Sequence, residues 1–292
     1  MVFEFRRLRF SFAALDRIRF PAGKPANVLR GALGTVFREM ACVPECPEAK
    51  KCERRQGCAY ARVFEPAAVL AGPSGLADLP RPFVFRARHL DAAEIRPGAS
   101  FWFDLHVFMQ DPDVLEHFTR TFREIGRRGL GPGRGRADLC RVDQLDPCQI
   151  PLDPPASSLR RIRVDFLTPT ELKHEDSIAT RPDFGILFAR VRDRIGTLSA
   201  LYGAGPLPID FGATSGRAAQ VRMIRCEIQS VKVTRRSSRT GQQHPIGGFT
   251  GSADYEGELG EFVPYLEAAR WTGVGRQTVW GKGELALAEL PE

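Results

Sequence analysis

Hydrophobic and polar positions along the first half of the chain recur with two different periods. Residues 3–12, 82–89 and 101–110 alternate with the period of a strand, and a further strand is expected near residues 137–145. Two other segments repeat apolar residues every three to four positions, as amphipathic helices do. One follows Asn27 and the other follows Asp111-Pro112, which fits a helix cap and first turn. The predicted order is β-α-β-β-α-β, the ferredoxin-like arrangement.

The second half repeats the same order after a linker with three prolines at residues 149–158. Strands are expected at 159–167, 221–234, 247–257 and 283–290, with helices at 182–201 and 261–269. The pattern predicts an α+β protein of two tandem ferredoxin-like (RRM-like, βαββαβ) domains. We place the first domain at residues 1–150 and the second at residues 151–292.

A glycine-rich stretch precedes the last predicted strand and reads G-V-G-R-Q-T-V-W-G-K-G over residues 273–283. Its two G-x-G pairs are Gly273/Gly275 and Gly281/Gly283. Glycine tolerates positive φ and lets another backbone approach closely. Together with Arg276 and Lys282, such a loop could present amides and cations to a phosphate. A tight turn packed against its own domain is the alternative.

The charge of the chain favours a polyanionic partner, since the formal net charge is +7 and the pI about 9.2. Residues 216–240 carry seven basic side chains and one acid, and residues 120–141 carry seven arginines and two acids. The first run includes Lys232, Arg235, Arg236 and Arg239, expected on a turn between two strands. Such runs are also found as solvated faces with no ligand.

Four of the seven cysteines lie within 17 residues in a C-x3-C-x5-C-x5-C spacing: Cys42, Cys46, Cys52 and Cys58. Four thiolates at this spacing can close around one tetrahedral zinc ion, and the intervening residues hold little apolar content. The pattern therefore predicts a structural zinc site in a Cys-rich loop, residues 42–58, inserted in the first domain. An iron–sulfur cluster and unligated buried thiols are the alternatives.

No apolar run reaches the ~18–20 residues that span a bilayer, and the first ten residues lack the apolar segment of a signal peptide. We therefore expect a cytoplasmic protein with no membrane partner.

Several short motifs together resemble a known family. They are L-R-G-A-L-G at 29–34, the cysteines leading to Cys58-Ala-Tyr60, L-T-P-T-E-L at 167–172, G-G-F-T-G at 247–251, F-V-P-Y-L at 262–266 and the glycine-rich stretch. The chain resembles the RAMP superfamily of CRISPR-associated proteins, in its branch of repeat-RNA-processing endoribonucleases. The resemblance implies binding of precursor CRISPR RNA and cleavage without a metal or other cofactor. Activation of a ribose 2′-OH would leave a 2′,3′-cyclic phosphate on mature crRNA.

Two other functions fit the same sequence. A non-catalytic RAMP subunit would hold crRNA in a CRISPR effector complex. A zinc-stabilised scaffold would use the basic runs to bind an acidic protein.

The cleavage chemistry needs a base, an acid and a cation near the phosphate, and histidine is a natural acid or base because its pKa is near neutral. Several family members carry a histidine near the first helix, but this sequence has none before His89. The candidates are His174, on a predicted loop after a strand, and His244, after the basic turn; a polar loop residue is the alternative for each. For RNA binding, the candidates are Lys232, Arg235, Arg236, Arg239, Gly273, Gly275, Arg276, Gly281, Lys282 and Gly283.

Overall fold

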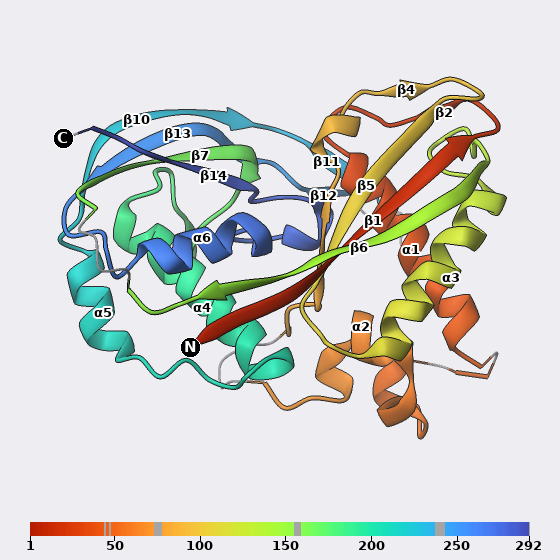
Figure 1. Cartoon of the computed structure of the whole chain (residues 1–292), viewed down its shortest axis with the longest axis horizontal. Coiled ribbons are helices and arrows are strands. Elements are labelled where there is room, and N and C mark those ends of the chain that lie inside the picture. The colour runs from red at the N-terminus through yellow and green to blue at the C-terminus, as the bar shows by residue number, and fades with distance from the viewer. Residues whose placement is uncertain (44, 47, 73–77, 155–158, 237–242, 292) are drawn as a thin grey trace.

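The structure is a computed structural model that describes residues 1–43, 45–46, 48–72, 78–154, 159–236 and 243–291. For residues 146–147, 235–236 and 243–245 it describes the backbone alone. Two antiparallel four-stranded sheets lie side by side, each packed against helices (Figure 1). The architecture is therefore mixed α+β, as the sequence predicted.

The first sheet has the strand order β3-β5-β1-β6 and is built from the N-terminal half. Along the chain the elements are β1 (Val2–Ala14), β2 (Ile18–Arg19), α1 (Pro25–Ala41), α2 (Ala59–Phe64), β3 (Phe83–Arg86), β4 (Glu94–Ile95), β5 (Ser100–Val107), α3 (Pro112–Arg128) and β6 (Ala137–Pro151). Short 3-10 helices lie between them: η1 (Ala49–Lys51), η2 (Arg55–Gly57), η3 (Pro66–Ala68) and η4 (Arg88–Leu90).

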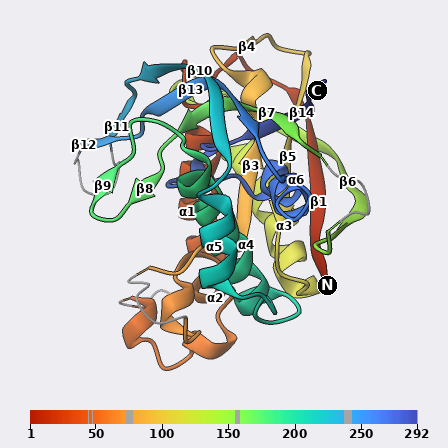
Figure 2. The same ribbon diagram turned by 90° about the vertical axis from the view of Figure 1, so that its left-hand side faces the viewer.

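The second sheet has the equivalent strand order, β10-β13-β7-β14. Its elements are β7 (Arg161–Thr170), β8 (Lys173–His174), β9 (Ser177–Ile178), α4 (Phe184–Tyr202), α5 (Phe211–Ala218), β10 (Arg222–Val231), β11 (Thr234–Arg236), β12 (Gln243–Pro245), β13 (Gly248–Glu256), α6 (Val263–Thr272), η5 (Thr278–Trp280) and β14 (Leu285–Glu289). The small hairpins β8–β9 and β11–β12 project from the same side of the molecule (Figure 2).

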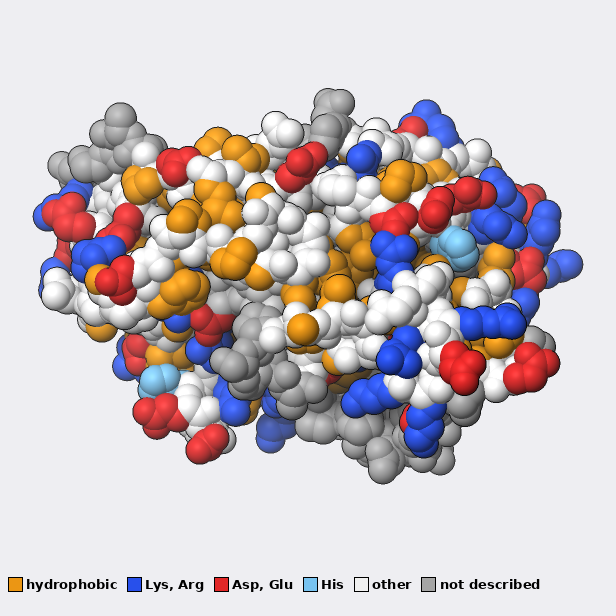
Figure 3. Space-filling model, turned by 90° about the horizontal axis from the view of Figure 1, so that it is seen from below, with side chains coloured by type: hydrophobic (Ala, Val, Ile, Leu, Met, Phe, Trp, Pro, Cys, Tyr) orange, Lys and Arg blue, Asp and Glu red, His pale blue; other side chains and the backbone are white. Residues whose placement is uncertain are grey.

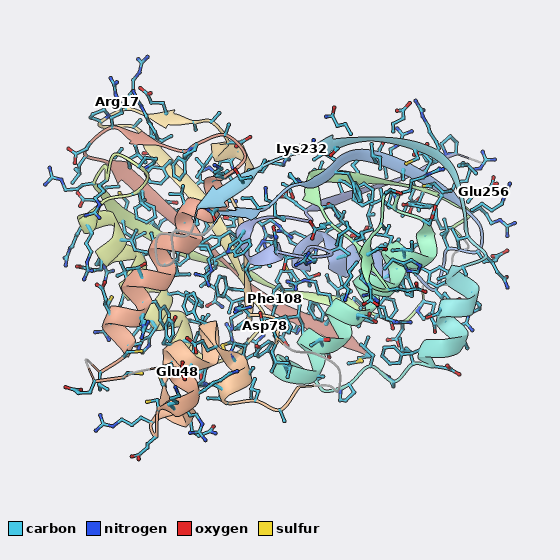
Figure 4. All side chains as sticks on the ribbon, turned by 180° about the vertical axis from the view of Figure 1, so that it is seen from behind. Arg17, Glu48, Asp78, Phe108, Lys232 and Glu256 are labelled. Atoms are coloured by element: carbon cyan, nitrogen blue, oxygen red, sulfur yellow. The ribbon has the colours of Figure 1, made fainter. Side chains whose placement is uncertain are left out.

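Strand β1 contributes to two separate hydrophobic cores. Phe3 and Phe5 pack with the C-terminal helices α4 and α6, whereas Phe10 and Phe12 pack with α1 and α3. Side chains alternate across a strand, so the odd-numbered Phe3 and Phe5 face one side of β1 and the even-numbered Phe10 and Phe12 face the other. The two halves are therefore joined through a shared strand, and Phe108 packs against Phe3 and Phe5 near the middle of the molecule (Figure 4).

Some boundaries differ from those predicted. Helix α1 begins at Pro25 rather than after Asn27, because proline suits the first helical turn. Strand β6 runs on to Pro151, into the predicted linker, since an edge strand tolerates proline. The short helices α2 and α5 were not predicted. The predicted cap holds, because the Asp111 carboxylate accepts the amide of Asp113 at 2.9 Å.

Candidate nucleic-acid interface

The glycine-rich loop, residues 273–283, connects α6 to β14 and packs between the two halves of the molecule. All four glycines of its G-x-G pairs have positive φ, from +70° to +79°. A Cβ added at Gly283 would lie 1.9 Å from the carbonyl oxygen of Val274, and one at Gly281 would lie 2.6 Å from Cβ of Ala26 in α1. Both positions thus require glycine for conformation and for space. The loop is fixed against the start of α1.

Within the loop, several residues that the sequence predicted to contact RNA are buried in the protein. Gly273, Lys282 and Gly283 are buried. The amide of Gly283 donates to the carbonyl of Pro169 at 3.2 Å. The guanidinium of Arg276 lies 2.6 Å from the carboxylate of Glu171. These contacts agree with a packed turn, and RNA contact by this loop stays a prediction for its accessible members Gly275, Arg276 and Gly281.

The C-terminal end of α6, just before the loop, is capped by side chains from both halves. Arg86 of β3 donates to the carbonyls of Arg270 and Trp271, each at 2.9 Å, and His106 of β5 meets the Trp271 carbonyl at 3.0 Å. Arg194 of α4 donates to the Thr272 carbonyl at 2.9 Å. Cations at a helix C-terminus satisfy its free carbonyls and complement its dipole.

Burial lowers the pKa values of the groups in this cap. Desolvation, helped by the nearby Arg86 charge, lowers the pKa of Arg194 to about 9. The same two causes hold the pKa of His106 well below its usual value, so this imidazole is neutral. His106 is 2% exposed and belongs to the core.

Lys282 carries a cation from the loop into the N-terminal half. Its side chain is 3% exposed, and Nζ donates to the carbonyl of Gly23 at 3.2 Å. Burial lowers the pKa of Lys282 to about 8; Asp91 opposes this effect and Lys24 adds to it. The sequence signalled Lys282 only through its flanking glycines, and nothing in the pattern indicated its partner.

The basic hairpin is the loop and strand pair β11–β12 that leaves β10 and returns to β13. Lys232 is exposed at its base, where the chain crosses from the C-terminal half toward the N-terminal half (Figure 4). The backbones of Arg235 and His244 pair in the hairpin. Their side chains, that of Arg236, and the whole of Arg239 lie outside the described residues. The hairpin base adjoins the turn before α1, since a Cβ at Gly23 would lie 3.2 Å from Cγ2 of Val233.

Many other cations of the two basic runs are neutralised by carboxylates. In the run at 216–240, three arginines pair with Glu261, Glu256 and Glu227: Arg217, Arg222 and Arg225. In the run at 120–141, four of the seven arginines form ion pairs: Arg127, Arg128, Arg136 and Arg141. Figure 3 shows Lys and Arg side chains interleaved with Asp and Glu at the right-hand end of one face. Among the described residues, these ion pairs reduce the free positive charge of both runs, and Lys232 stays exposed at the base of the hairpin.

The two predicted catalytic histidines lie on projecting hairpins, unlike the other described histidines. His174 is exposed on β8, in the hairpin that follows β7. His89 stacks on Trp102 with ring centroids 4.0 Å apart, and His117 meets the Asp113 carbonyl at 2.8 Å. His174 and His244 thus lie on the two hairpins that project from the same side of the molecule in Figure 2.

The four clustered cysteines come together in space. All are half-buried free thiols, and they line one small cavity: Cys42, Cys46, Cys52 and Cys58. Burial, with contributions from Cys58 and Cys46, raises the pKa of Cys42 to about 12. Within the described part of the chain, however, no group of three or more His, Cys, Asp or Glu side chains is arranged to hold a metal ion. The structure thus brings the thiols together without supporting the zinc prediction.

Comparison with family models covers nearly the whole chain. Residues 3–158 match the N-terminal-domain model AF_1859_N, and residues 164–285 match the model described as CRISPR-associated endoribonuclease Cas6. The second half of the chain thus matches the CRISPR-associated Cas6 endoribonuclease family. The predicted resemblance to repeat-RNA-processing proteins is therefore confirmed. Among curated protein sequences no match was found.

Solved Cas6 structures share the fold of this protein. Thermus thermophilus Cas6 is 16% identical with a TM-score of 0.56, and the match covers 98% of each chain. Two structures described as Cas6 product complexes have TM-scores of 0.57 and 0.58 at 17% and 16% identity. They cover 98% and 99% of this chain and all of their own. At these identities the likeness establishes a common fold. No helix among the described residues is long and apolar enough to cross a membrane.

Proposed function

We propose that this protein binds the repeat segments of precursor CRISPR RNA and cleaves them to mature crRNA. The observation that carries the proposal is the match of residues 164–285 to the Cas6 endoribonuclease family. Whole-chain similarity to structures described as Cas6 product and substrate mimic complexes supports it. Precursor CRISPR RNA is therefore the proposed partner, in the cytoplasm, with a CRISPR effector complex as the proposed destination of the product.

We assign the two halves as tandem ferredoxin-like domains, residues 1–150 and 151–292, with the Cys-rich loop inserted in the first. Support comes from the strand order, in which the first and fourth strands of each β-α-β-β-α-β unit are neighbours.

RNA binding is proposed for the basic hairpin. Lys232 is exposed at its base, and Arg235, Arg236 and Arg239 follow in sequence. Cations on a projecting hairpin contact phosphates and release counterions, which makes affinity fall with salt. In A-form RNA the deep groove hides the bases, so the contacts should read backbone and shape.

Cleavage is proposed to proceed by attack of a ribose 2′-OH on the adjacent phosphorus. The bond from the 2′-oxygen to phosphorus forms as the bond to the 5′-oxygen breaks, which leaves a 2′,3′-cyclic phosphate. His174 and His244 are the proposed acid and base, one taking the 2′-OH proton and the other giving a proton to the 5′-oxygen. No step needs a metal, in keeping with the family resemblance.

The test is incubation of the purified protein with the CRISPR repeat RNA of its own genome in EDTA. A discrete cut with a cyclic phosphate end establishes the enzyme. RNA that is bound but left intact establishes the rival function, a non-catalytic subunit that binds crRNA. The absence of any histidine before His89 favours this rival. RNA that is not bound at low salt refutes both.

We further propose that the four clustered cysteines bind a structural zinc ion. The proposal rests on the C-x3-C-x5-C-x5-C spacing of the four residues in the sequence. Protein purified under reducing conditions should contain about one zinc per chain by elemental mass spectrometry. The double variant Cys42→Ser/Cys58→Ser should lose the metal and melt at lower temperature, whereas the exposed Cys140→Ser should change neither. Protein that takes up no zinc after refolding with the metal contradicts the assignment.

A further inference from the structure

The glycine-rich loop and the turn before α1 are joined by a single buried ammonium group. Lys282 and Gly23 are 259 residues apart in sequence, and Nζ of Lys282 donates to the Gly23 carbonyl at 3.2 Å. Gly281, the preceding residue, packs on Ala26 in the first turn of α1. Two successive loop residues therefore hold the beginning of this helix.

The same turn is held from its other side by a carboxylate. The amide of Gly23 donates to Oδ1 of Asp91 at 2.5 Å, and the amide of Lys24 donates to the Pro21 carbonyl at 3.1 Å. Gly23 has a φ of +70°, a conformation that glycine adopts without strain. Both peptide groups that flank Gly23 are thus fixed, one through Lys282 and one through Asp91.

Lys24, the residue after this turn, is the N-cap of α1 and is only half-buried. Burial is the main cause of the lowered pKa of Lys282, and the nearby charge of the Lys24 ammonium adds to it. In the first turn Pro25 has no N–H, and Val28 is the first residue whose amide donates back, to the Lys24 carbonyl at 3.0 Å. The helix N-terminus adds partial positive charge to that of the two lysines.

The two lysines and the N-terminus of α1 lie beside the base of the basic hairpin. Val233, between Lys232 and the first residue of β11, touches the Gly23 turn. RNA whose phosphates follow the hairpin would therefore pass Lys24 as it reaches the junction of the two halves. Lys282 itself is covered by the turn and would stay out of contact with RNA.

We infer that Lys282 is a positioning residue for RNA cleavage: it fixes the Gly23 turn so that the Lys24 ammonium faces the phosphate at the point of cleavage. The inference rests on the proposed function. Lys24 is the catalytic cation, neutralising charge on the non-bridging phosphate oxygens as the 2′-oxygen bond forms and the 5′-oxygen bond breaks. The protons travel as proposed above, through the general base and acid, so Lys24 and Lys282 exchange none.

The experiment compares Lys24→Met, Lys282→Met and the double variant, with the exposed Lys51→Met in the Cys-rich loop as the matched control. Single-turnover cleavage should slow by about tenfold or more in each single variant, while the Kd for repeat RNA changes by less than about threefold. Because Lys282 acts through Lys24, the double variant should be no slower than Lys24→Met. Losses that multiply, or a normal rate in Lys282→Met, overturn the inference.

A second variant and a second readout keep the two proposals distinguishable. Asp91→Ala releases the turn from its exposed side and should reproduce the loss of rate; a normal rate there counts against positioning. Hydrogen exchange at the amides of Gly23 and Lys24 should speed up by about tenfold or more in Lys282→Met and stay unchanged in Lys51→Met. If the wild-type protein cuts no repeat RNA, the proposed function fails, and unchanged exchange would falsify the positioning role separately.

Discussion

Replacing Lys282 with methionine should make the protein more stable at neutral pH. A buried ammonium costs free energy, and that cost appears as the fall in the pKa of Lys282 from its usual 10.5 to about 8. At about 1.4 kcal/mol per tenfold change in proton affinity, the fall corresponds to about 3 kcal/mol. Methionine has a similar length without the charge. The variant loses the hydrogen bond to the Gly23 carbonyl, worth about 1 kcal/mol, so the net gain is about 2 kcal/mol.

The gain should depend on pH in a defined window. The folded protein binds the Lys282 proton less tightly than the unfolded chain, so the unfolded chain holds more protons between pH 8 and 10.5. The free energy of unfolding of the wild-type protein therefore rises relative to the variant across this window. Below pH 8 the advantage of the variant is constant. Above pH 10.5 the cost of the charge is gone, and the variant should be less stable by about 1 kcal/mol, the value of the lost hydrogen bond. Cysteines and tyrosines also titrate here, but they are common to both proteins and cancel in the difference.

Guanidinium unfolding of both proteins from pH 6.5 to 10.5 measures this difference, with Lys51→Met as the control. Lys51 is exposed beside Glu48, so its variant should shift stability by less than about 0.5 kcal/mol at any pH. A variant Lys282→Met that is less stable than wild type at pH 7, by an amount independent of pH, refutes the reasoning. It would mean that the ammonium is a net stabiliser of the junction.

Three further outcomes are expected. His174→Ala or His244→Ala should lower cleavage of repeat RNA while leaving binding intact; if both variants cut at the normal rate, these residues are not the acid and base. Replacing Arg235, Arg236 and Arg239 together by glutamine should weaken RNA binding. It should also reduce the slope of log K against log salt by about two to three, because each phosphate contact that is lost removes roughly 0.7–0.9 from the slope. An unchanged salt slope would remove the hairpin from the interface. Gly283→Ala places a methyl group against the Val274 carbonyl at a positive φ and should destabilise the fold by more than about 2 kcal/mol. Gly31→Ala lies at an open position of α1 and should stabilise the fold slightly. Thermal melting of both variants measures the two effects. Equal effects of the two would show that the loop adapts.

Local patterns identified most of the long elements because their signals lie within a few residues. The buried stripe of α4, from Phe184 to Leu198, follows the predicted helical period. The Asp111-Pro112 start of α3 needs only the first turn of the helix itself. The short helices α2 and α5 escaped, since six to eight residues hold too few turns for a periodic pattern.

The candidate site was less accessible to sequence reasoning. Its residue types were visible: glycines with Arg276 and Lys282, a basic turn, and histidines on loops. Their roles depend on partners far away in the chain. Lys282 points to Gly23, and Arg276 pairs with Glu171, so two nominated RNA contacts already have partners inside the protein.

Strand β1 shows where the two kinds of information divide. The sequence alone determined that residues 3–12 form a strand, and its apolar positions change phase between Phe5 and Leu8. Alternation is a local property of the backbone, so it can be read from a few residues. Only the tertiary structure decided that the first pair of phenylalanines enters the core under α4 and α6 and the later ones the core under α1 and α3. That choice depends on which helices return to each face of the sheet, and α4 and α6 come from the other half of the chain. For the same reason, sequence supplied the glycine-rich loop, and tertiary structure supplied the helix that it holds.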